Sequence, residues 1–268
     1  MKKYIFMAVA GMLALSSCSN DDNDIQDAKN APRQMTFTAS YSDGATTRAS
    51  LSGKSVSFDA GDDISIFSAN NNNVKFHTSS GGATATFYDI YSTATAGDPT
   101  YYALYPYNGS YSLSKGNINN VVIPIDQSAA ASSACGWDPD APIAFASTTG
   151  STLEFHNLCA LLKITNDLGD GSNIAISFEG HYATGPFYLN LSSVTLEANV
   201  LECKYSVKAD GVPNGKTIYL AIAPGTYTSL WAMCGGGASG DYGYIEKSSS
   251  STFEAGKIYN LGNTSSWE

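Results

Sequence analysis

The chain has 268 residues, only 14% of them charged, and its 25 glycines and 17 tyrosines accompany many serines and threonines. This composition favours short strands joined by polar turns, and the length suits two domains of about a hundred residues or one large all-β domain. The formal charge of −10 would repel a phosphate backbone, which argues against nucleic acid as a partner.

The N-terminus has the pattern of a bacterial lipoprotein signal. Two lysines precede an apolar run over residues 4–15, and the sequence Leu-Ser-Ser-Cys ends at Cys18. We expect residues 1–17 to be removed and Cys18 to be lipidated. An ordinary secretory signal or a membrane span are the alternatives, but the run is about half the ~20 apolar residues that a span needs. Cleavage removes two lysines and no acid, which changes the formal charge from −10 to −12.

Residues 18–33 are polar and acidic and show no apolar periodicity. We expect them to form a flexible tether between the lipid and the first folded element. Beyond the tether, apolar and polar residues alternate in short runs separated by turn-forming Gly, Asn and Asp, which indicates a sandwich or a barrel. The first series of expected strands is 35–41, 63–67, 83–88, 100–105, 121–125 and 152–165.

A glycine-rich acidic segment at 166–171 follows the apolar run 159–164 and is the best candidate for a domain boundary. We therefore expect an N-terminal β-sandwich domain over 34–166 and a C-terminal one over 167–268. Only 127–135, rich in Ala and Ser, is expected to form a helical turn or two. The second series of expected strands is 174–178, 187–191, 200–207, 217–223, 228–234, 242–245 and 257–261.

The residue types that carry chemistry in enzymes are dispersed along the chain. It has no nucleophile elbow, zinc-binding His pair, phosphate loop or dinucleotide fingerprint. His156 and Cys159 could be imagined as a catalytic dyad. In a chain of strands joined by turns, we prefer the interpretation that the two residues pack at the edge of the core. The acidic groups around 59–63, 138–140 and 167–170 lack the register of a calcium loop and are interpreted as turn residues that cap strand ends. We expect a protein that is not an enzyme, with no catalytic residue, metal or cofactor.

Four cysteines remain once Cys18 is assigned to lipid: Cys135, Cys159, Cys203 and Cys234. In an oxidising compartment they allow three pairings, which the spacing does not distinguish. The alternative is that they are small buried apolar residues. We prefer this for Cys203, which is in phase with its neighbours Leu201, Tyr205 and Val207 on the expected inward face of a strand.

The chain contains only two arginines, Arg33 and Arg48, both near its start. A protease specific for arginine would therefore cut nowhere after Ala49 and would leave the folded body intact. The alternative is chance under a preference for lysine, of which the chain has twelve spread over its length.

Several segments together resemble the fimbrillin and Mfa-like family of Bacteroidetes surface lipoproteins, the type V pilins. The resemblance covers nearly the whole chain and keeps the family's order of motifs. Besides the lipoprotein signal, the matching segments are 37–39, 47–49, 60–67, 101–107, 123–127, 153–158, 219–225 and 253–261, followed by Trp267.

The resemblance implies two tandem transthyretin-like β-sandwich domains in an all-β protein. It also implies a precursor that carries lipid, such as palmitate, on Cys18 and is routed to the outer membrane and exposed on the cell surface. In polymerising members, cleavage after an arginine releases the first strand, and Arg48 occupies the matching position with Ala49 as the new N-terminus. The acidic run after Cys18 resembles the surface-export signal of these lipoproteins.

The alternation at Phe37, Ala39 and Tyr41 agrees with this implied mechanism. A strand with one buried face that is removed leaves an apolar groove flanked by unpaired backbone groups, which invites a strand from another subunit. In relatives the donor strand lies at the C-terminal end, and here Ile258, Tyr259 and Leu261 would supply its apolar contacts.

The sequence thus predicts a lipid-anchored precursor of a fimbrial subunit that assembles by strand exchange after Arg-specific proteolysis and contributes to adhesion. Its expected partners are other pilin subunits, the outer-membrane lipid and a host or bacterial surface receptor. The alternative is a stand-alone or anchor lipoprotein that binds glycans and does not polymerise. In that case aromatic loops, with Trp137 as the residue to test, would form the site.

Overall fold

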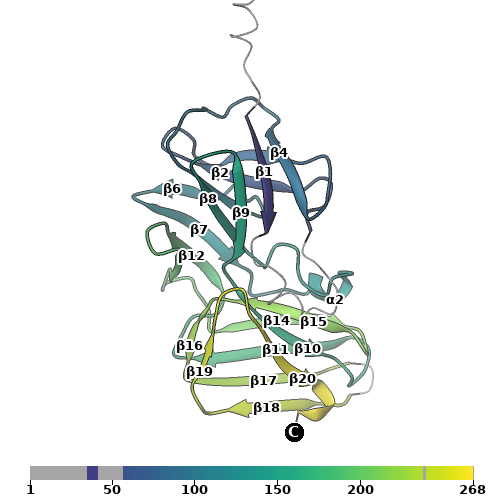
Figure 1. Cartoon of the computed structure of the whole chain (residues 1–268). Coiled ribbons are helices and arrows are strands. Elements are labelled where there is room, and N and C mark those ends of the chain that lie inside the picture. Colours follow the sequence, from purple (N-terminus) through teal and green to yellow (C-terminus); the bar gives the residue numbers. More distant parts are fainter. Residues whose placement is uncertain (1–34, 42–56, 238–239, 268) are drawn as a thin grey trace, which may run out of the picture. The chain divides into compact units, whose positions relative to one another are not determined.

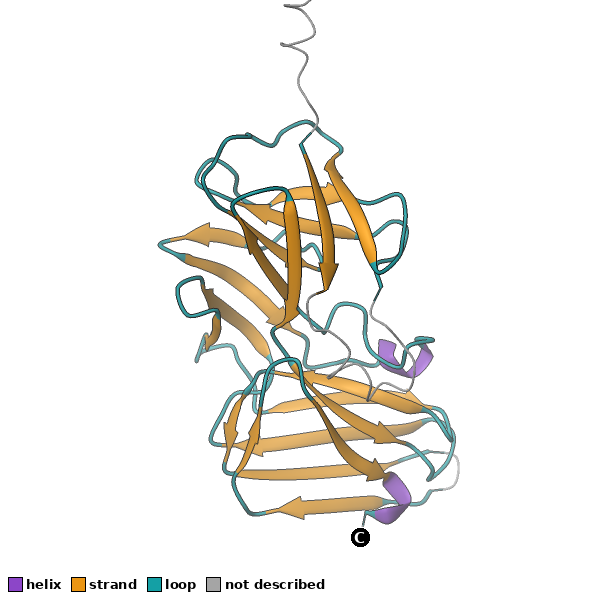
Figure 2. Ribbon diagram, in the orientation of Figure 1, coloured by secondary structure: helices purple, strands orange, loops and turns teal. Residues whose placement is uncertain are grey.

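The computed structural model describes residues 35–41, 57–237 and 240–267. Within these residues the chain forms twenty strands, the short helix α2 (Ala129–Ser132) and the 3-10 turn η2 (Thr264–Ser266) (Figures 1 and 2). The predicted all-β fold is confirmed, and α2 lies inside the segment expected to be helical. No helix of the described part is long and apolar enough to cross a membrane.

The first series of strands forms one sheet that closes on itself. The order around the closed sheet is β1-β4-β3-β2-β5-β8-β9, with β1 returning to β9. Neighbours are antiparallel except β1 and β9, which run parallel. The strands are β1 (Thr36–Tyr41), β2 (Asp63–Phe67), β3 (Val74–His77), β4 (Thr84–Asp89), β5 (Tyr101–Tyr105), β8 (Ala144–Thr148) and β9 (Thr152–Asn157).

Alternation along these strands fills the interior of the closed sheet with apolar side chains. In β4, for example, Ala85 and Phe87 are buried, whereas Thr84 and Thr86, which alternate with them, are exposed. The resulting core is rich in aromatic rings contributed by five of the strands and by Phe58. Because an aromatic ring buries about 150–250 Å², these rings supply much of the apolar burial that holds the closed sheet together.

The second series forms a sandwich of two main sheets. One has the order β14-β11-β17-β18 and the other β15-β10-β20, and their inward side chains form a common core. The strands are β10 (Ala160–Thr165), β11 (Ser172–Glu179), β14 (Ser206–Val212), β15 (Thr217–Ile222), β17 (Ser229–Gly235), β18 (Gly243–Lys247) and β20 (Ile258–Asn263), with the two-stranded ribbon β16 (Gly225–Tyr227) and β19 (Ser251–Phe253).

A further sheet draws its strands from both halves of the chain. Its order is β13-β12-β7-β6, with β6 (Ser112–Ser114), β7 (Asn117–Ile123), β12 (Gly185–Asn190) and β13 (Thr195–Ala198). The predicted boundary near residue 166 does fall between β10 and β11, but paired strands cross it: β7 with β12, and β10 with both β15 and β20. The division into domains at 34–166 and 167–268 stays a prediction.

The expected strand over 200–207 is wrong for most of its length. Residues 199–203 form a turn, in which the backbone N–H groups of Glu202 and Cys203 both donate to the Asn199 carbonyl at 3.0 Å, and β14 begins only at Ser206. Leu201 is 88% exposed, so its phase with Cys203 has no structural meaning. The interpretation of Cys203 as a buried residue is nevertheless confirmed, and its thiol donates to the Pro186 carbonyl at 3.0 Å.

The four cysteines of the described chain are all free thiols, so none of the three pairings is present. Cys159, Cys203 and Cys234 are buried and Cys135 is half-buried. Burial raises the pKa of the Cys159 thiol to about 12. It also raises the pKa of the Cys203 and Cys234 thiols, so these three cysteines behave as small apolar core residues.

Candidate functional site

The first strand is hydrogen-bonded on both sides and is the element that closes the sheet around the aromatic core. On one side β1 pairs antiparallel with β4, which places Phe37 opposite Phe87. On the other it pairs parallel with β9, which places Tyr41 opposite Phe155. The Thr38 backbone N–H also donates to the Ser151 carbonyl at 2.8 Å. Figure 1 shows β1 lying between its two neighbours.

The side chains of β1 alternate as the sequence predicts. Phe37 and Ala39 are 1% and 0% exposed, whereas Thr36 and Thr38 face outward. The ring of Phe37 packs at 5.5 Å from that of Phe76 and at 5.3 Å from that of Tyr101. The inner face of β1 is therefore embedded in the aromatic core.

Tyr41, the third residue predicted on this strand, is half-buried at its C-terminal end. Its ring stacks on Phe58 with centroids 5.0 Å apart and also contacts Phe155 at 5.9 Å. All three predicted side chains of β1 thus contact the core. Whether the strand is displaced stays a prediction.

We call the space that β1 occupies the β1 groove. Without β1, the sheet would keep six strands and would have two unpaired edges, β4 and β9. The groove would expose apolar side chains together with the N–H and C=O groups of those edges, which is the combination that binds an added strand. Its apolar walls are Phe58, Phe76, Phe87, Tyr101, Leu153 and Phe155.

Phe58 is a residue of the groove that the sequence analysis missed. It forms an isolated bridge with Gly82, through hydrogen bonds of 3.0 and 2.8 Å in the two directions, and its ring packs edge-on against Phe87 and Phe155. It alternates with Val56 and Ala60 across polar Ser57 and Asp59, a short pattern that the sequence analysis did not count as a strand. Because Phe58 follows residue 48 in the chain, a body cut there would keep this wall of the groove.

Several predicted site residues lie outside the described residues. The lipidation site Cys18 falls in the segment 1–34, and the processing site Arg48 and Ala49 falls in 42–56. Their roles stay predictions.

The predicted donor residues Ile258, Tyr259 and Leu261 are engaged within their own sheet. β20 runs parallel to β10 and lies at the edge of the order β15-β10-β20. The ring of Tyr259 packs edge-on against Phe253 with centroids 4.7 Å apart, and its hydroxyl accepts from the Glu254 backbone N–H at 2.8 Å. Ile258 and Leu261 are half-buried. A donor role would require β20 to leave β10.

The turn after β20 is fastened by a polar cluster that we call the C-terminal clasp. The Asp167 carboxylate accepts from the Thr264 hydroxyl at 3.0 Å and from both the backbone N–H and the hydroxyl of Ser265 at 2.6 Å. Buried Trp267 donates its indole N–H to the Leu261 carbonyl at 3.0 Å. Burial alone would raise the pKa of Asp167, but the hydrogen bonds from Ser265 and Thr264 outweigh it and hold that pKa below its usual value.

The other polar candidates have structural roles. Asp62 accepts from the Asp59 backbone N–H at 2.8 Å, and Asp138 accepts from that of Asp140 at 3.0 Å, which confirms these carboxylates as turn caps. The Asp63 carboxylate lies 2.9 Å from Nδ1 of His77. No cluster of three metal-ligating side chains occurs in the described part of the chain.

The histidine, cysteine and tryptophan candidates are not brought together. His156 lies on the exposed side of β9, whereas Cys159 is buried and its thiol donates to the Ala141 carbonyl at 3.7 Å. Trp137 is half-buried, and its ring packs against Tyr219 with centroids 6.2 Å apart.

Comparisons with known proteins give a shared fold. No protein-family model matches the chain, and no curated protein matches it either. A candidate cell adhesion protein from Bacteroides ovatus is similar in structure, with a TM-score of 0.56 at 12% identity, over 85% of this chain and 90% of that one. A second, from Bacteroides uniformis, has a TM-score of 0.53 at 17% identity, over 86% and 92% of the two chains.

A fimbrial protein from Bacteroides vulgatus is a weaker match, with a TM-score of 0.32 at 12% identity over 87% of this chain and 96% of that one. The first two likenesses establish a common all-β fold with the Bacteroides adhesion candidates. They agree with the resemblance to the fimbrillin and Mfa-like family that the sequence motifs indicate.

Proposed function

We propose that the chain is the lipid-anchored precursor of a fimbrial subunit, that cleavage after Arg48 frees its first strand, and that subunits then assemble by strand exchange and contribute to adhesion. The lipid is attached at Cys18 and holds the precursor on the outer membrane. The observation that carries the proposal is the position of β1, which alone separates the closed aromatic core from an open groove with two unpaired edges.

The covalent connections of β1 make this strand suited to exchange. Arg33 precedes it and Arg48 follows it, so a cut after Arg48 separates the strand from the body that contains the rest of the groove. The cut strand would then be held by non-covalent contacts: its two ladders, the burial of Phe37 and Ala39, and the packing of Met35 and Tyr41 against the core. In the proposed assembly a donor strand from another subunit, at its C-terminal end with Ile258, Tyr259 and Leu261, replaces these contacts and fills the groove.

The shared fold supports the cell-surface part of the proposal. Two solved structures of similar fold are candidate cell adhesion proteins from Bacteroides. The pattern of a lipoprotein signal ending at Cys18 is separate support for a mature chain outside the cytoplasm.

The test uses the positions of the two arginines. Purified precursor is treated with an Arg-specific protease and compared with Arg48→Ala and Arg33→Ala variants by N-terminal sequencing and by gel electrophoresis without boiling. In the wild type and in Arg33→Ala we expect a body that starts at Ala49 and forms ladders. In Arg48→Ala the cut after Arg33 leaves β1 on the body, which should stay monomeric.

A body that starts at Ala49 yet persists as a monomer would contradict assembly and favour the stand-alone or anchor lipoprotein. Adding a synthetic peptide of residues 35–41 sharpens the result, because it should refill the β1 groove and suppress the ladders. The same peptide with Phe37→Ala should suppress them far less, since it lacks the main side chain of the inner face.

A further inference from the structure

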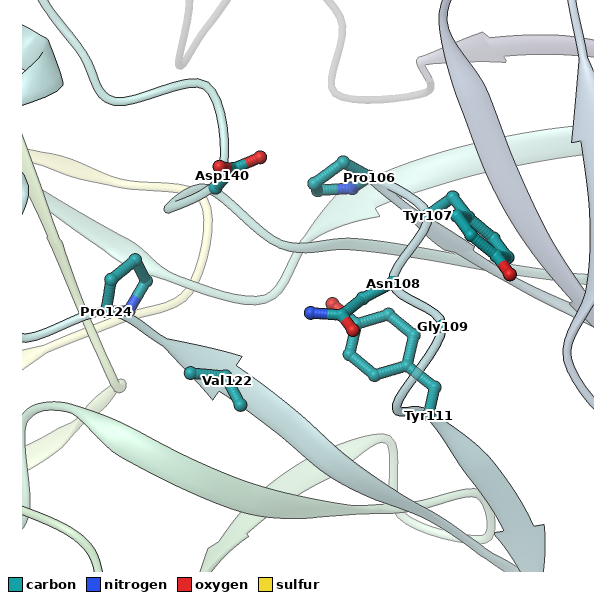
Figure 3. Close-up of a pocket in the computed structure, with 8 residues that line it drawn as sticks. All are labelled: Pro106, Tyr107, Asn108, Gly109, Tyr111, Val122, Pro124 and Asp140. Atoms are coloured by element: carbon teal, nitrogen blue, oxygen red, sulfur yellow. The ribbon is translucent and has the colours of Figure 1, made fainter.

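A cavity of about 540 Å³ lies among the loop between β5 and β6, the end of β7 and the turn around residue 140 (Figure 3). Pro106, Val122 and Pro124 supply rigid apolar walls, and Tyr107 stands beside them. The ammonium of Lys75 lies over the ring of Tyr107, 5.1 Å from its centroid. The volume of the cavity falls within the size range of small-molecule sites.

The most informative of its polar groups is the hydroxyl of Tyr111. This residue is only 4% exposed and its ring belongs to a buried apolar cluster. Burial raises the pKa of the phenol, which stays neutral. Among the described residues its hydroxyl has no hydrogen-bond partner, and Figure 3 shows it directed into the cavity. The fully buried unpaired side-chain atoms of the described chain are the Ser65 hydroxyl and the Asn73 oxygen, so the Tyr111 hydroxyl opens to the cavity and is available to a ligand there.

Asn108 presents a second group in a fixed orientation. Its side-chain oxygen accepts from the backbone N–H of Ser110 at 2.9 Å and from the Ser110 hydroxyl at 2.8 Å, and its backbone carbonyl accepts from Asn73 at 2.8 Å. The oxygen is therefore committed to the turn, and the amide NH₂ is left facing the same open space as Tyr111 (Figure 3). That NH₂ makes no hydrogen bond within the described chain.

The third polar group is the carboxylate of Asp140, which lies across the cavity from Tyr111 (Figure 3). Its backbone is fixed because its N–H donates to the Asp138 carboxylate at 3.0 Å, and the next N–H, of Ala141, donates to the Asp138 carbonyl at 3.1 Å. Its own carboxylate has no hydrogen bond or ion pair with any described residue. The cavity thus offers a donor, an acceptor and a hydroxyl that can be either.

The mixture of these groups selects the chemistry of the ligand. An anion would be repelled by Asp140, which is one of many carboxylates on an acidic chain. An ammonium group has only donors and could use neither the Asn108 NH₂ nor the donor capacity of Tyr111. Neighbouring hydroxyl groups on a ring can donate to Asp140 and accept from Asn108 at once, while the C–H faces of the ring pack on Pro106, Val122 and Pro124.

We propose that this cavity is a binding site for a neutral sugar ring, such as one pyranose unit of a surface glycan. Tyr111, Asn108 and Asp140 form its hydrogen bonds, and the prolines and Val122 form its apolar walls. The site shares no residue with the walls of the β1 groove.

The test measures binding of neutral methyl glycosides of glucose, galactose, mannose and N-acetylglucosamine to the full chain by saturation-transfer NMR and titration. Tyr111→Phe removes only the hydroxyl, and Asn108→Asp keeps the oxygen that holds the turn while replacing the donor NH₂. Each should weaken binding by about 3- to 10-fold, as expected for one lost hydrogen bond. Tyr244→Phe, which removes a hydroxyl bonded to Glu246 on β18, is the matched control and should bind as the wild type does.

Stability gives a second readout. Since the Tyr111 hydroxyl has no protein partner, Tyr111→Phe should not lower the thermal midpoint, whereas a hydroxyl with a hidden structural role would lower it. The proposal is overturned if none of the four glycosides binds, or if binding is unchanged in Tyr111→Phe. It is also overturned if a lysine amide binds and the glycosides do not, because that would make the cavity an ammonium site around Asp140.

Discussion

The first and last strands of the described chain, β1 and β20, are held by different forces. β1 is paired on both sides and inserts fully buried side chains into an aromatic core. β20 is paired on one side, its apolar residues are only half-buried, and the turn that follows it is fastened by hydrogen bonds to one carboxylate. The contrast shows that one chain fixes its first strand by two ladders and apolar burial, and its last strand by one ladder, a polar clasp and the buried Trp267.

This contrast matters for exchange because the two kinds of attachment fail differently. Losing β1 exposes two backbone edges and an apolar groove, so an empty groove is strongly unfavourable and a replacement strand is favoured. Releasing β20 exposes one edge, on β10, and also withdraws buried Trp267 and the half-buried Tyr259 and Leu261 from the core of the second sandwich. If subunits exchange strands as proposed, the β1 groove, with its two edges, is the stronger site for a partner strand.

The largest expected effect follows from replacing the main buried side chain of β1. In the uncut precursor, Phe37→Ala should lower the free energy of unfolding of the closed sheet by about 3–5 kcal/mol, because it removes an aromatic ring and leaves a cavity. Thr38→Ala, on the outward face of the same strand, should change it by less than about 0.5 kcal/mol. Chemical denaturation followed by circular dichroism measures both, and near-equal losses would mean that β1 is not held by its inner face.

The sequence was sufficient to predict the elements that rest on local alternation. The expected strands at 63–67, 100–105 and 217–223 correspond closely to β2, β5 and β15. The inward positions of Phe37 and Ala39 were likewise predicted, because one buried face forces a period of two. At 200–207 the same reasoning was wrong, since backbone hydrogen bonds to Asn199 make a turn there whatever the phase of the side chains.

Long-range contacts could not be predicted from the sequence. The parallel pairing of β1 with β9 joins segments more than a hundred residues apart, and it alone closes the first sheet. Asp167 was recognised only as an acidic turn residue, because its partner Ser265 lies 98 residues further along the chain. The cavity at Tyr111 likewise combines three separate segments, none of which carries a binding motif.

A smaller effect is expected from acid acting on the C-terminal clasp. The pKa of Asp167 is lowered in the folded state, so the folded chain binds this proton less tightly than the unfolded chain does. The clasp therefore contributes fully above the ordinary Asp pKa of about 3.9 and is lost as the pH falls through the lowered value. The indole N–H signal of Trp267 in ¹⁵N NMR should shift on acidification below about pH 4.

Asp167→Asn should produce that shift already at neutral pH, because an amide cannot accept all three hydrogen bonds. Asp170→Asn is the control, since the Asp170 carboxylate accepts from the Asn214 backbone N–H at 2.8 Å and does not contact the clasp. A Trp267 signal in Asp167→Asn that matches the wild type throughout would show that burial of the indole, rather than the clasp, holds the C-terminus.

The smallest effect is expected within the clasp itself. Ser265→Ala removes the hydroxyl bonded to Asp167 but keeps the backbone N–H that is also bonded to it, so the free energy of unfolding should fall by only about 0.5–1.5 kcal/mol. Ser266→Ala removes a neighbouring hydroxyl that donates instead to the Asn263 carbonyl at 2.6 Å. In double-mutant cycles with Asp167→Asn, Ser265 should show a coupling energy of at least about 0.5 kcal/mol and Ser266 none. Equal coupling for both would mean that the turn is stabilised as a whole, and the polar attachment of β20 could then not be assigned to Asp167.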